Sequence, residues 1–413
     1  MTKQDTSPRV AGPGVRIGER TWLRAGVAVA SVGWGANQFA PLLLMYRAEL
    51  GLSAATVQAT FGLYALGLIP GLLLGGPVSD RFGRRRVMLP ALGVSALASG
   101  LLILGGSAPG WLFAGRLIAG VASGAAFSSG AVWIKELSGA GSAREVNPGP
   151  RRVTTTMTAG FGAGPFVAGV LAQWAPAHTV VPYLPHLALV VLAVPLVLGA
   201  PETRAPRPGT GFRQALRVPA AREHRFRAVV VPLAPWVFGA ASIALAYLPG
   251  LVGDRLGGGA LAFSALVTTL TAVAGILVLP LARGVDRPGT PRLIGAALVT
   301  VVAGLLVAAA AAATAQPVLV VLAAVVLGGG YGCCQVCGLL EVQRLARPGE
   351  LAGLTALYQA LTYLGFAAPF LLAAAQRFVP ASVLLLVVAA LAVLTLAWTV
   401  RAVRFTRSSG EKP

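Results

Sequence analysis

Few residues in the apolar parts of this sequence could take part in chemistry, and Arg116 and His186 are the main ones. Arg116 is the one charged residue inside an apolar stretch, and His186 is the one residue there that ordinarily titrates near neutral pH. An ionisable group at membrane depth is costly and usually functional. We therefore expect Arg116 to contact Asn37, Gln38 or an anionic ligand, unless its side chain extends outward to the membrane surface. His186 is either a packed, neutral histidine or a candidate for carrying a proton.

Acidic and cysteine residues limit the remaining chemistry. All 13 acidic residues lie in tails, loops or the ends of apolar stretches, so no carboxylate is expected in mid-membrane to bind a proton or a cationic ligand. Cys333, Cys334 and Cys337 lie close together, but no His or acidic residue stands beside them at metal-ligand spacing. We expect them to ease helix packing, with no metal, cofactor or disulfide. A phosphate-binding glycine loop and a Ser/His/acid set are both absent from the sequence, so we do not expect an enzyme.

The composition indicates that membrane-spanning helices position these residues. Of the 413 residues, 56% are hydrophobic and only 11% are charged, whereas a soluble protein has roughly 25% charged residues. Apolar stretches of about 20 residues, long enough to cross a bilayer, recur along the chain. We predict spans at 25–46, 56–78, 88–106, 111–134, 153–175, 181–199, 228–250, 261–282, 293–314, 318–340, 353–375 and 380–400.

Basic residues are distributed unevenly between the two sides that these spans define. Arg47, Arg255 and Arg377 are the only basic residues in the predicted outer loops, and all others except Arg116 fall in tails and loops on the opposite side. This distribution follows the positive-inside rule and predicts that both termini are cytoplasmic, with the chain in the inner membrane. The net charge of +20 then faces anionic membrane lipids, and we do not expect nucleic acid as a partner.

The second half of the sequence repeats features of the first. The aligned pairs are Asp80 with Asp286, Gly120 with Gly328, Gly124 with Gly332, and Pro165 with Pro369. All of them are separated by about half of the chain, which indicates an internal duplication. We therefore predict an all-α membrane protein with 12 transmembrane helices in two pseudo-symmetric six-helix halves. The predicted boundaries are a disordered cytoplasmic tail at 1–24, a first half at 25–199, a cytoplasmic linker at 200–227, a second half at 228–400 and a cytoplasmic tail at 401–413.

Several short segments resemble signatures of one transporter family. Gly-Gly-Pro-Val-Ser-Asp80-Arg-Phe-Gly-Arg-Arg-Arg resembles the loop between helices 2 and 3 of the major facilitator superfamily, and Arg116-Leu-Ile-Ala-Gly120 is similar to its Arg-xxx-Gly of helix 4. The segment from Gly160 to Gly169 resembles the GxxxGPxxGG element of helix 5 in antiporter branches, with Ala168 in place of its penultimate glycine. The Pro-Glu-Thr that starts at Pro201 is a further family feature. The resemblance implies a twelve-helix transporter.

The resemblance also implies that the loop after the second span is a gate that locks the two halves together on the cytoplasmic side. Asp80 could contact the N-terminus of the eleventh helix near Leu351, where a carboxylate is favoured, and Arg84 or Arg85 could bridge to Glu136. We expect a second copy of this gate, in which Glu341 pairs with Arg287 or Arg292; its residues are Asp286, Arg287 and Glu341. The alternative is that these charges belong to solvated loops.

The fifth span carries the predicted helix bend. Pro165 removes a backbone hydrogen bond and permits a bend, while Gly160, Gly164 and Gly169 let a neighbouring helix approach closely. The resemblance implies that such a bend controls leakage in exchangers, and ordinary tight packing is the alternative.

In this family, spans one, four, seven and ten line the substrate cavity, so their polar and aromatic residues are the candidates. The predicted cavity residues are Asn37, Gln38, Arg116, Ser123, Phe127, Trp236, Phe238, Ser242, Tyr247, Tyr331 and Gln335. Polar side chains at membrane depth face protein or a water-filled cavity, and hydrogen bonding between helices is their alternative role.

The leading functional prediction is a secondary active transporter that exports a small hydrophobic or amphipathic molecule, by alternating access and in exchange with protons. Uptake or facilitated diffusion of a neutral or anionic metabolite is the alternative, based on Arg116 and the missing mid-membrane acid. A membrane receptor that does not transport is a remote third. The expected partners are a small-molecule substrate, protons and membrane lipids, and we expect a monomer.

Overall fold

The computed structural model describes residues 20–139, 148–204, 218–348 and 350–408, and these residues form helices with no strand among them. Twelve helical segments in this part of the chain are long and apolar enough to cross a membrane, which confirms the number of spans that the sequence predicts. The last of these helices ends later than predicted, because α17 continues beyond residue 400 to Ser408. The tail at 1–19 and the middle of the linker at 205–217 lie outside the described residues.

The helices are arranged in two groups of six spans. The first half contains α1 (Trp22–Asn37), η1 (Ala40–Leu42), α2 (Leu43–Glu49), α3 (Ala54–Phe82), α4 (Arg84–Leu104), α5 (Pro109–Gly139), α6 (Gly149–Trp174), η2 (Val181–Tyr183) and α7 (Leu184–Leu198). After η3 (Pro219–Arg222), the second half contains η4 (Phe226–Val230), α9 (Val231–Ser242), η5 (Ile243–Tyr247), α10 (Pro249–Val252), α11 (Ala260–Leu277), α12 (Leu279–Val285), α13 (Arg292–Thr314), α14 (Pro317–Leu345), α15 (Leu351–Thr362), η8 (Tyr363–Ala367), α16 (Ala368–Ala375) and α17 (Ala381–Ser408).

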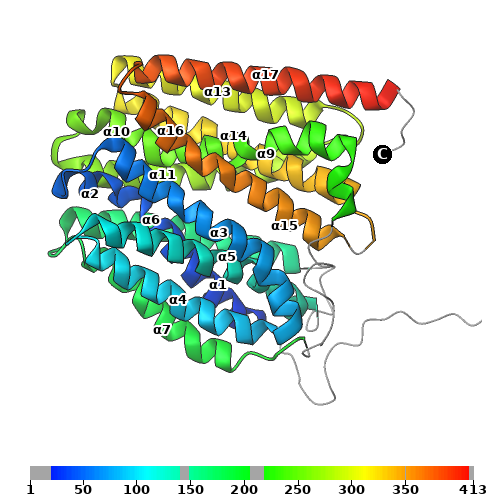
Figure 1. Ribbon diagram of the computed structural model, residues 1–413, viewed down its shortest axis with the longest axis horizontal. Coiled ribbons are helices and arrows are strands. Elements are labelled where there is room, and N and C mark those ends of the chain that lie inside the picture. The colour runs from blue at the N-terminus through cyan, green and yellow to red at the C-terminus, as the bar shows by residue number, and fades with distance from the viewer. Residues whose placement is uncertain (1–19, 140–147, 205–217, 349, 409–413) are drawn as a thin grey trace, which may run out of the picture.

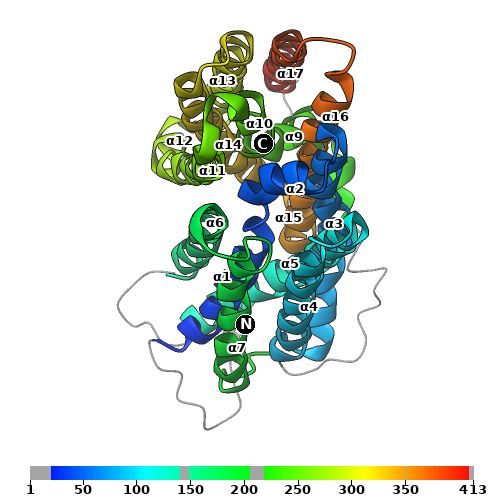
Figure 2. The same cartoon turned by 90° about the vertical axis from the view of Figure 1, so that its left-hand side faces the viewer.

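The two halves meet along two seams. In Figure 1 the first half lies below and the second half above, with α3 running beside α15 and α16. The other seam joins α6 to α11, as the turned view in Figure 2 shows. Each half has its own buried hydrophobic core, and the core of the first half also takes in Ala246, Tyr363 and Phe366 of the second half at the seam. This arrangement confirms the predicted fold class.

Small residues allow the helices inside each half to pack closely. A Cβ added to Gly124 of α5 would lie 2.4 Å from the backbone oxygen of Leu68 in α3. A Cβ added to Gly332 of α14 would lie 2.1 Å from the backbone oxygen of Gly275 in α11. These two glycines are the pair that the sequence aligns between the halves, and both are needed because no side chain fits between the backbones.

Regular α-helix is interrupted in several spans, and three of the interruptions lie near the cavity. The first span changes from α1 to the 3₁₀ turn η1 after Gln38, where Pro41 lacks a backbone donor. The seventh contains the π-helical turn η5, and the eleventh contains the 3₁₀ segment η8. Such irregular turns often mark functional positions within helices, and all three contribute to or adjoin the cavity described below.

The ends of the spans form two opposite faces of the molecule. The linker face carries the α3–α4 turn, the segment that follows α7 and the start of α15, and lies toward the right of Figure 1. The far face carries α2, α10 and the end of α16, and lies toward the left.

Candidate functional site

A small cavity of about 60 Å³ lies between the two halves. Three of its lining residues come from the first half, namely Asn37, Tyr64 and Phe161. The second half contributes Phe238, Ala241, Ser242, Leu245, Thr268, Thr271, Ala272, Tyr331, Tyr363 and Phe366. Because both halves form its walls, a movement of one half against the other changes its volume and its access.

Stacked aromatic rings form much of the cavity wall. The ring of Phe238 stacks on that of Tyr363 with a centroid distance of 4.4 Å, and on that of Tyr331 at 5.6 Å. Phe366 extends the cluster across the seam, since its ring lies 5.0 Å from Phe61 and 5.9 Å from Tyr64 of the first half. This cluster offers flat apolar faces to a ligand.

The polar groups of the cavity are neutral. Ser242 donates to the backbone oxygens of Gly239 and Gly365, each at 3.1 Å, and Thr268 and Thr271 donate to carbonyls of their own helix, so these three hydroxyls offer acceptor lone pairs to a ligand. The amide of Asn37 donates only weakly, to the backbone oxygen of Gly33 at 3.5 Å.

Tyr331 and Tyr363 provide hydrogen-bond donors in the same cavity. Neither hydroxyl has a hydrogen-bond partner among the described residues. Each is therefore available to a bound molecule.

Arg116 lies behind Tyr64 and is only 1% exposed, so its side chain does not extend to the membrane surface. Its guanidinium donates to the backbone oxygen of Ala36 at 3.0 Å and to that of Phe61 at 3.4 Å. Its Cζ atom lies 4.5 Å from the ring centroid of Tyr64 and 4.8 Å from that of Phe39. No carboxylate among the described residues forms an ion pair with it.

The interruption of the first span explains how this cation is accommodated. Because α1 ends at Asn37 in mid-membrane, the carbonyls of its last turn lack helical partners and carry the negative end of the helix dipole. Arg116 donates to one of these carbonyls, at Ala36, and the aromatic faces around it add cation–π attraction.

The structure brings only part of the predicted cavity set together. Asn37, Phe238, Ser242 and Tyr331 line the cavity. Phe127 packs edge-on against the lining residue Phe161 at 5.3 Å.

Five other predicted residues do not line it. Ser123 is buried inside the first half, and Gln38 donates to Ser99 inside the same half at 3.0 Å. Trp236 donates to Thr395 of α17, Tyr247 donates to Gln376 near the far face, and Gln335 donates to Gln359 of α15.

Several lining residues come from spans that the sequence analysis did not consider. Tyr64 lies in the second span, Phe161 in the fifth, Thr268 and Thr271 in the eighth, and Tyr363 and Phe366 in the eleventh. The last pair lies on either side of Gly365, at the point where the structure shows the eleventh span leaving regular α-helix.

His186 lies inside the first half, away from the cavity. It is fully buried, with Ser99 Oγ 2.7 Å from its Nδ1 and Ser95 Oγ 3.3 Å from its Nε2. Gln38 also donates to Ser99, so a buried chain of polar groups connects the break in α1 to the sixth span. The side-chain amide oxygen of Gln38, Oε1, has no hydrogen-bond partner among the described residues.

The predicted gate residues of the first half form a charged cluster at the linker face. Arg84 is 2% exposed and lies 2.9 Å from Glu136 and 2.8 Å from Asp80, while Arg204 lies 4.0 Å from Asp80. Asp80 was expected to contact the start of the eleventh helix near Leu351. Instead, its pairs within the described chain are formed inside its own half.

The segment after the sixth span is attached to this cluster. Glu202 accepts hydrogen bonds from the backbone N–H groups of Arg84 at 2.8 Å and Arg85 at 2.9 Å, and so caps the N-terminus of α4. Gly83 permits this approach, because it has a φ of +103° and its added Cβ would lie 2.7 Å from the Glu202 carboxylate. Arg85 also donates to the backbone oxygen of Leu198.

The second half has a comparable charged cluster with different partners from those predicted. Glu341 was expected to pair with Arg287 or Arg292. In the structure it pairs with Arg225 and Arg344, each at 2.8 Å, and Arg344 also pairs with Asp286. Arg287 is exposed and forms no ion pair among the described residues.

Hydrogen bonds from side chains cross between the halves near the far face. Gln58 of α3 donates to the backbone oxygen of Ala246 in η5 at 2.6 Å. Gln173 of α6 accepts from the backbone N–H of Ala262 at 3.2 Å and donates to the backbone oxygen of Gly258. In the described part of the chain, these are the side-chain hydrogen bonds that join the halves, so this conformation is held together toward the far face.

The glycines of the fifth span lie at close helix contacts. An added Cβ at Gly160 would lie 2.3 Å from the backbone oxygen of Ala30, and one at Gly164 would lie 2.8 Å from that of Trp34, both in α1. At Gly169 it would meet Ala265 across the seam, at 2.4 Å. Pro165 lies inside α6, which runs without interruption from Gly149 to Trp174.

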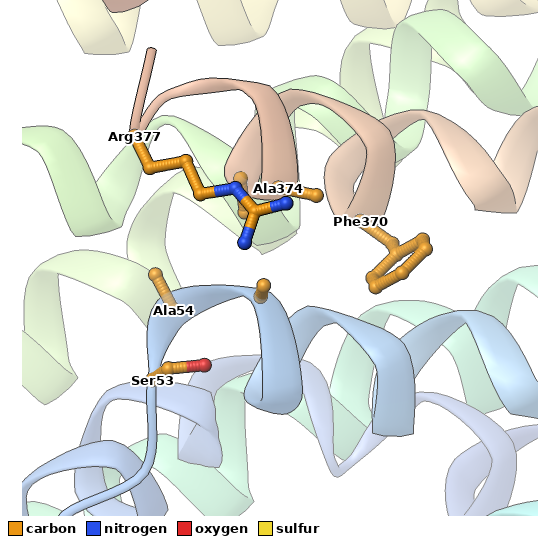
Figure 3. A pocket seen from close by; sticks show the side chains of 7 residues that line it. Ser53, Ala54, Phe370, Ala374 and Arg377 are labelled. Carbon is orange, nitrogen blue, oxygen red and sulfur yellow. The ribbon is translucent and has the colours of Figure 1, made fainter.

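A second, open pocket of about 490 Å³ lies at the far face between α3 and α16. Figure 3 shows Arg377 extending over this groove above Ser53 and Ala54, with Phe370 on the same wall. Its lining is otherwise alanine. We assign the main site to the smaller cavity, because that cavity lies at the level of the helix breaks and contains the cluster of aromatic and polar groups.

Two six-helix halves with a shared cavity between them are an architecture found in membrane transporters. The sequence matches the family model for the Major Facilitator Superfamily over residues 25–370. The chain therefore belongs to the major facilitator superfamily and is a multi-pass membrane protein.

Two curated proteins show partial similarity. The chain is 26% identical over 144 residues to the bacillibactin exporter of Bacillus subtilis (strain 168), a match that covers 34% of this chain and 36% of that protein. It is 31% identical over 104 residues to the 3-(3-hydroxy-phenyl)propionate transporter of Escherichia coli (strain K12), which covers 25% of this chain and 24% of that one. The matched segments thus span about a third and a quarter of these relatives.

Solved structures show the same fold over nearly the whole chain. The nucleoside transporter NupG superposes with a TM-score of 0.71 at 13% identity, covering 94% of this chain and 99% of the other. A D-xylose–proton symporter superposes with a TM-score of 0.67 at 17% identity, covering 92% of this chain and 96% of the other. The human organic anion transporter MFSD10 superposes with a TM-score of 0.65 at 17% identity, covering 92% of this chain and 99% of the other.

Proposed function

We propose that this protein exports a small, amphipathic aromatic molecule across the cytoplasmic membrane by alternating access. The observation that carries the proposal is the cavity between the halves, where stacked rings from both halves surround a few neutral polar groups. A flat apolar molecule with one or two polar substituents matches this lining. The relative named as an exporter supports the direction.

In this proposal the linker face is cytoplasmic. The distribution of basic residues supports it, because nearly all of them lie in tails and loops on that side, and positively charged segments are retained in the cytoplasm. The far face, where Gln58 and Gln173 join the halves, is then the outer side. The conformation described above would be the one closed to the outside.

We further propose that export is coupled to protons, on the basis of the helix 5 element typical of antiporter branches. His186 is then the proton carrier, since it is the group at membrane depth that ordinarily titrates near neutral pH. Its chain of partners through Ser99 and Gln38 leads to the break in α1, next to the cavity residue Asn37.

Inverted membrane vesicles test the proposal. Vesicles with the protein should accumulate an amphipathic aromatic dye when a proton gradient, acidic inside, is imposed, and should release it when an uncoupler collapses that gradient. Vesicles with Gly124→Trp protein, in which the α3–α5 contact cannot form, provide the inactive control once its membrane level is matched. Equal dye accumulation in both preparations would contradict export by this chain.

A second candidate function is uptake or facilitated diffusion of a neutral or anionic metabolite. It is favoured by Arg116, the buried cation beside the cavity, and by the relative named as a transporter of 3-(3-hydroxy-phenyl)propionate. Right-side-out vesicles separate the two functions. Inward movement of an aromatic acid without an imposed gradient would favour this candidate over proton-coupled export.

A further inference from the structure

We propose that Arg116 makes the central cavity selective for charge, so that it accepts aromatic anions and rejects aromatic cations of the same shape. The inference rests on the proposed role of this cavity as the substrate site, and it holds for either direction of transport.

The positive charge of Arg116 is not cancelled by an acid. The guanidinium is 1% exposed, and its hydrogen bonds go to the backbone oxygens of Ala36 and Phe61. Carbonyl groups and aromatic faces carry only partial negative charge. No acidic residue lines the cavity, and none of the described carboxylates pairs with Arg116. A net positive charge therefore remains beside the cavity.

Of the rings that contact Arg116, Tyr64 is the one that also lines the cavity. The Cζ atom of Arg116 lies 4.5 Å from the Tyr64 ring centroid, and Tyr64 is itself a lining residue. Arg116 is buried among aromatic rings, so its field is poorly screened by solvent. A charged ligand in the cavity would lie just beyond the Tyr64 ring. Across that ring, and with an effective dielectric constant of about 20, the charge of Arg116 would change the affinity for such a ligand by roughly tenfold or more.

The donor groups of the cavity complement an anion as well. The amide of Asn37 follows directly after Ala36, whose carbonyl holds Arg116, and it has only one weak hydrogen bond. The hydroxyls of Tyr331 and Tyr363 line the same cavity and have no hydrogen-bond partner within the described chain. A carboxylate or phenolate bound near Asn37 would thus meet N–H and O–H donors while its ring lies against Phe238 or Phe366.

Three ligands of nearly the same shape test this inference on the purified full-length protein. These are 3-phenylpropionate, 3-phenylpropanol and 3-phenylpropylamine, which are anionic, neutral and cationic at pH 7. Binding is measured by titration calorimetry in detergent. We expect the anion to bind at least roughly tenfold more tightly than the amine, with the alcohol between them.

Variants then assign the preference to its source. Arg116→Gln should bring the three affinities to within about threefold of one another, and Arg116→Lys should retain the order of the wild type. Arg255→Gln removes the same charge from an exposed far-face position and should leave the order unchanged. If Arg116→Gln does not fold, the order in the wild-type protein still decides the matter.

The possible outcomes separate the two proposals. Equal affinities in the wild type, tighter binding of the amine, or an anion preference that survives in folded Arg116→Gln would overturn the charge selectivity. If the alcohol binds and is transported without any charge preference, only this inference fails. If none of the three binds and none is transported, the proposed substrate class fails together with it.

Discussion

Gln58 in the first half donates a 2.6 Å hydrogen bond to the backbone oxygen of Ala246 in the second half. Gln173 makes the equivalent type of contact at the other seam, with Ala262 and Gly258. At the linker face, by contrast, the charged clusters around Arg84 and Glu341 pair within their own halves. Neutral amides thus join the halves near the far face, and the family-type gate residues stabilise each half separately in this conformation.

Replacing these two glutamines should weaken closure toward the far face. Gln58→Leu removes one hydrogen bond and Gln173→Leu removes two, each worth about 1 kcal/mol. The population open to that face should therefore rise by about fivefold in the first variant and by roughly 30-fold in the second. The measurement is the rate at which a cavity cysteine, Ser242→Cys, reacts with an impermeant thiol reagent added at the far face. Gln316→Leu changes an exposed far-face glutamine outside the seams and serves as the matched control. An unchanged rate in both seam variants would show that these bonds do not hold the far face closed.

Glu202 should stabilise the first charged cluster through the cap that it forms on α4. Glu202→Ala removes the acceptor for the backbone N–H groups of Arg84 and Arg85, and a lost cap costs about 1 kcal/mol. We expect a fall of a few degrees in the thermal midpoint of the purified protein. Gly83→Ala should cost more, because its φ of +103° disfavours any side chain and its Cβ would strike Glu202. The exposed change Asp254→Asn should have no effect, and an equal loss in this control would argue against the cap.

The two predicted gate carboxylates should differ strongly in their contribution to stability. The Glu341 side chain is 3% exposed and paired with Arg225 and Arg344. Glu341→Gln leaves Arg225 without a carboxylate partner, while Arg344 keeps Asp286, and should cost roughly 3 kcal/mol. The Asp80 side chain is 50% exposed, and Asp80→Asn should cost less than about 1 kcal/mol while still lowering transport. The free energy of unfolding of each variant is measured by titrating the purified protein with a denaturing detergent. A larger loss for Asp80→Asn than for Glu341→Gln would contradict this ranking.

Removing the titratable group of His186 should separate proton coupling from transport. The amide of His186→Asn reaches the position of Nδ1 and its bond to Ser99, but it cannot carry a proton at neutral pH. We expect vesicles with this variant to exchange dye between the two sides while no longer accumulating it in response to a proton gradient. Accumulation at the wild-type level would exclude His186 as the proton carrier. His178→Asn, at an exposed position of the far face, is the control.

The sequence predicts the fold well because hydropathy and small residues determine it. Apolar length defines the spans, and the aligned glycines Gly124 and Gly332 lie at close helix contacts in both halves. Side-chain directions near the middle of the membrane are less predictable. Asn37 and Gln38 are adjacent, yet Asn37 points into the cavity and Gln38 into the first half. They diverge because α1 ends at Asn37, before η1 begins.

The charged partners were also difficult to predict, since a loop signature gives the residues but not their pairing. Glu341 pairs with Arg225 and not with Arg287 or Arg292, which are nearer to it in the sequence. Arg225 lies far from Glu341 along the chain, directly before the seventh span. The eleventh-span residues Tyr363 and Phe366 reach the cavity only because η8 breaks that helix. No periodic pattern in the sequence marks such a break in advance.

Counterflow in proteoliposomes tests alternating access through the central cavity most directly. Vesicles that contain the purified protein are loaded with unlabelled 3-phenylpropionate and diluted into a trace of the labelled compound, with no ion gradient imposed. The account predicts a transient accumulation of label in the vesicles, which is abolished by Ser242→Trp, a change that fills the cavity. Label that only equilibrates, or accumulation that persists when the cavity is filled, would contradict it.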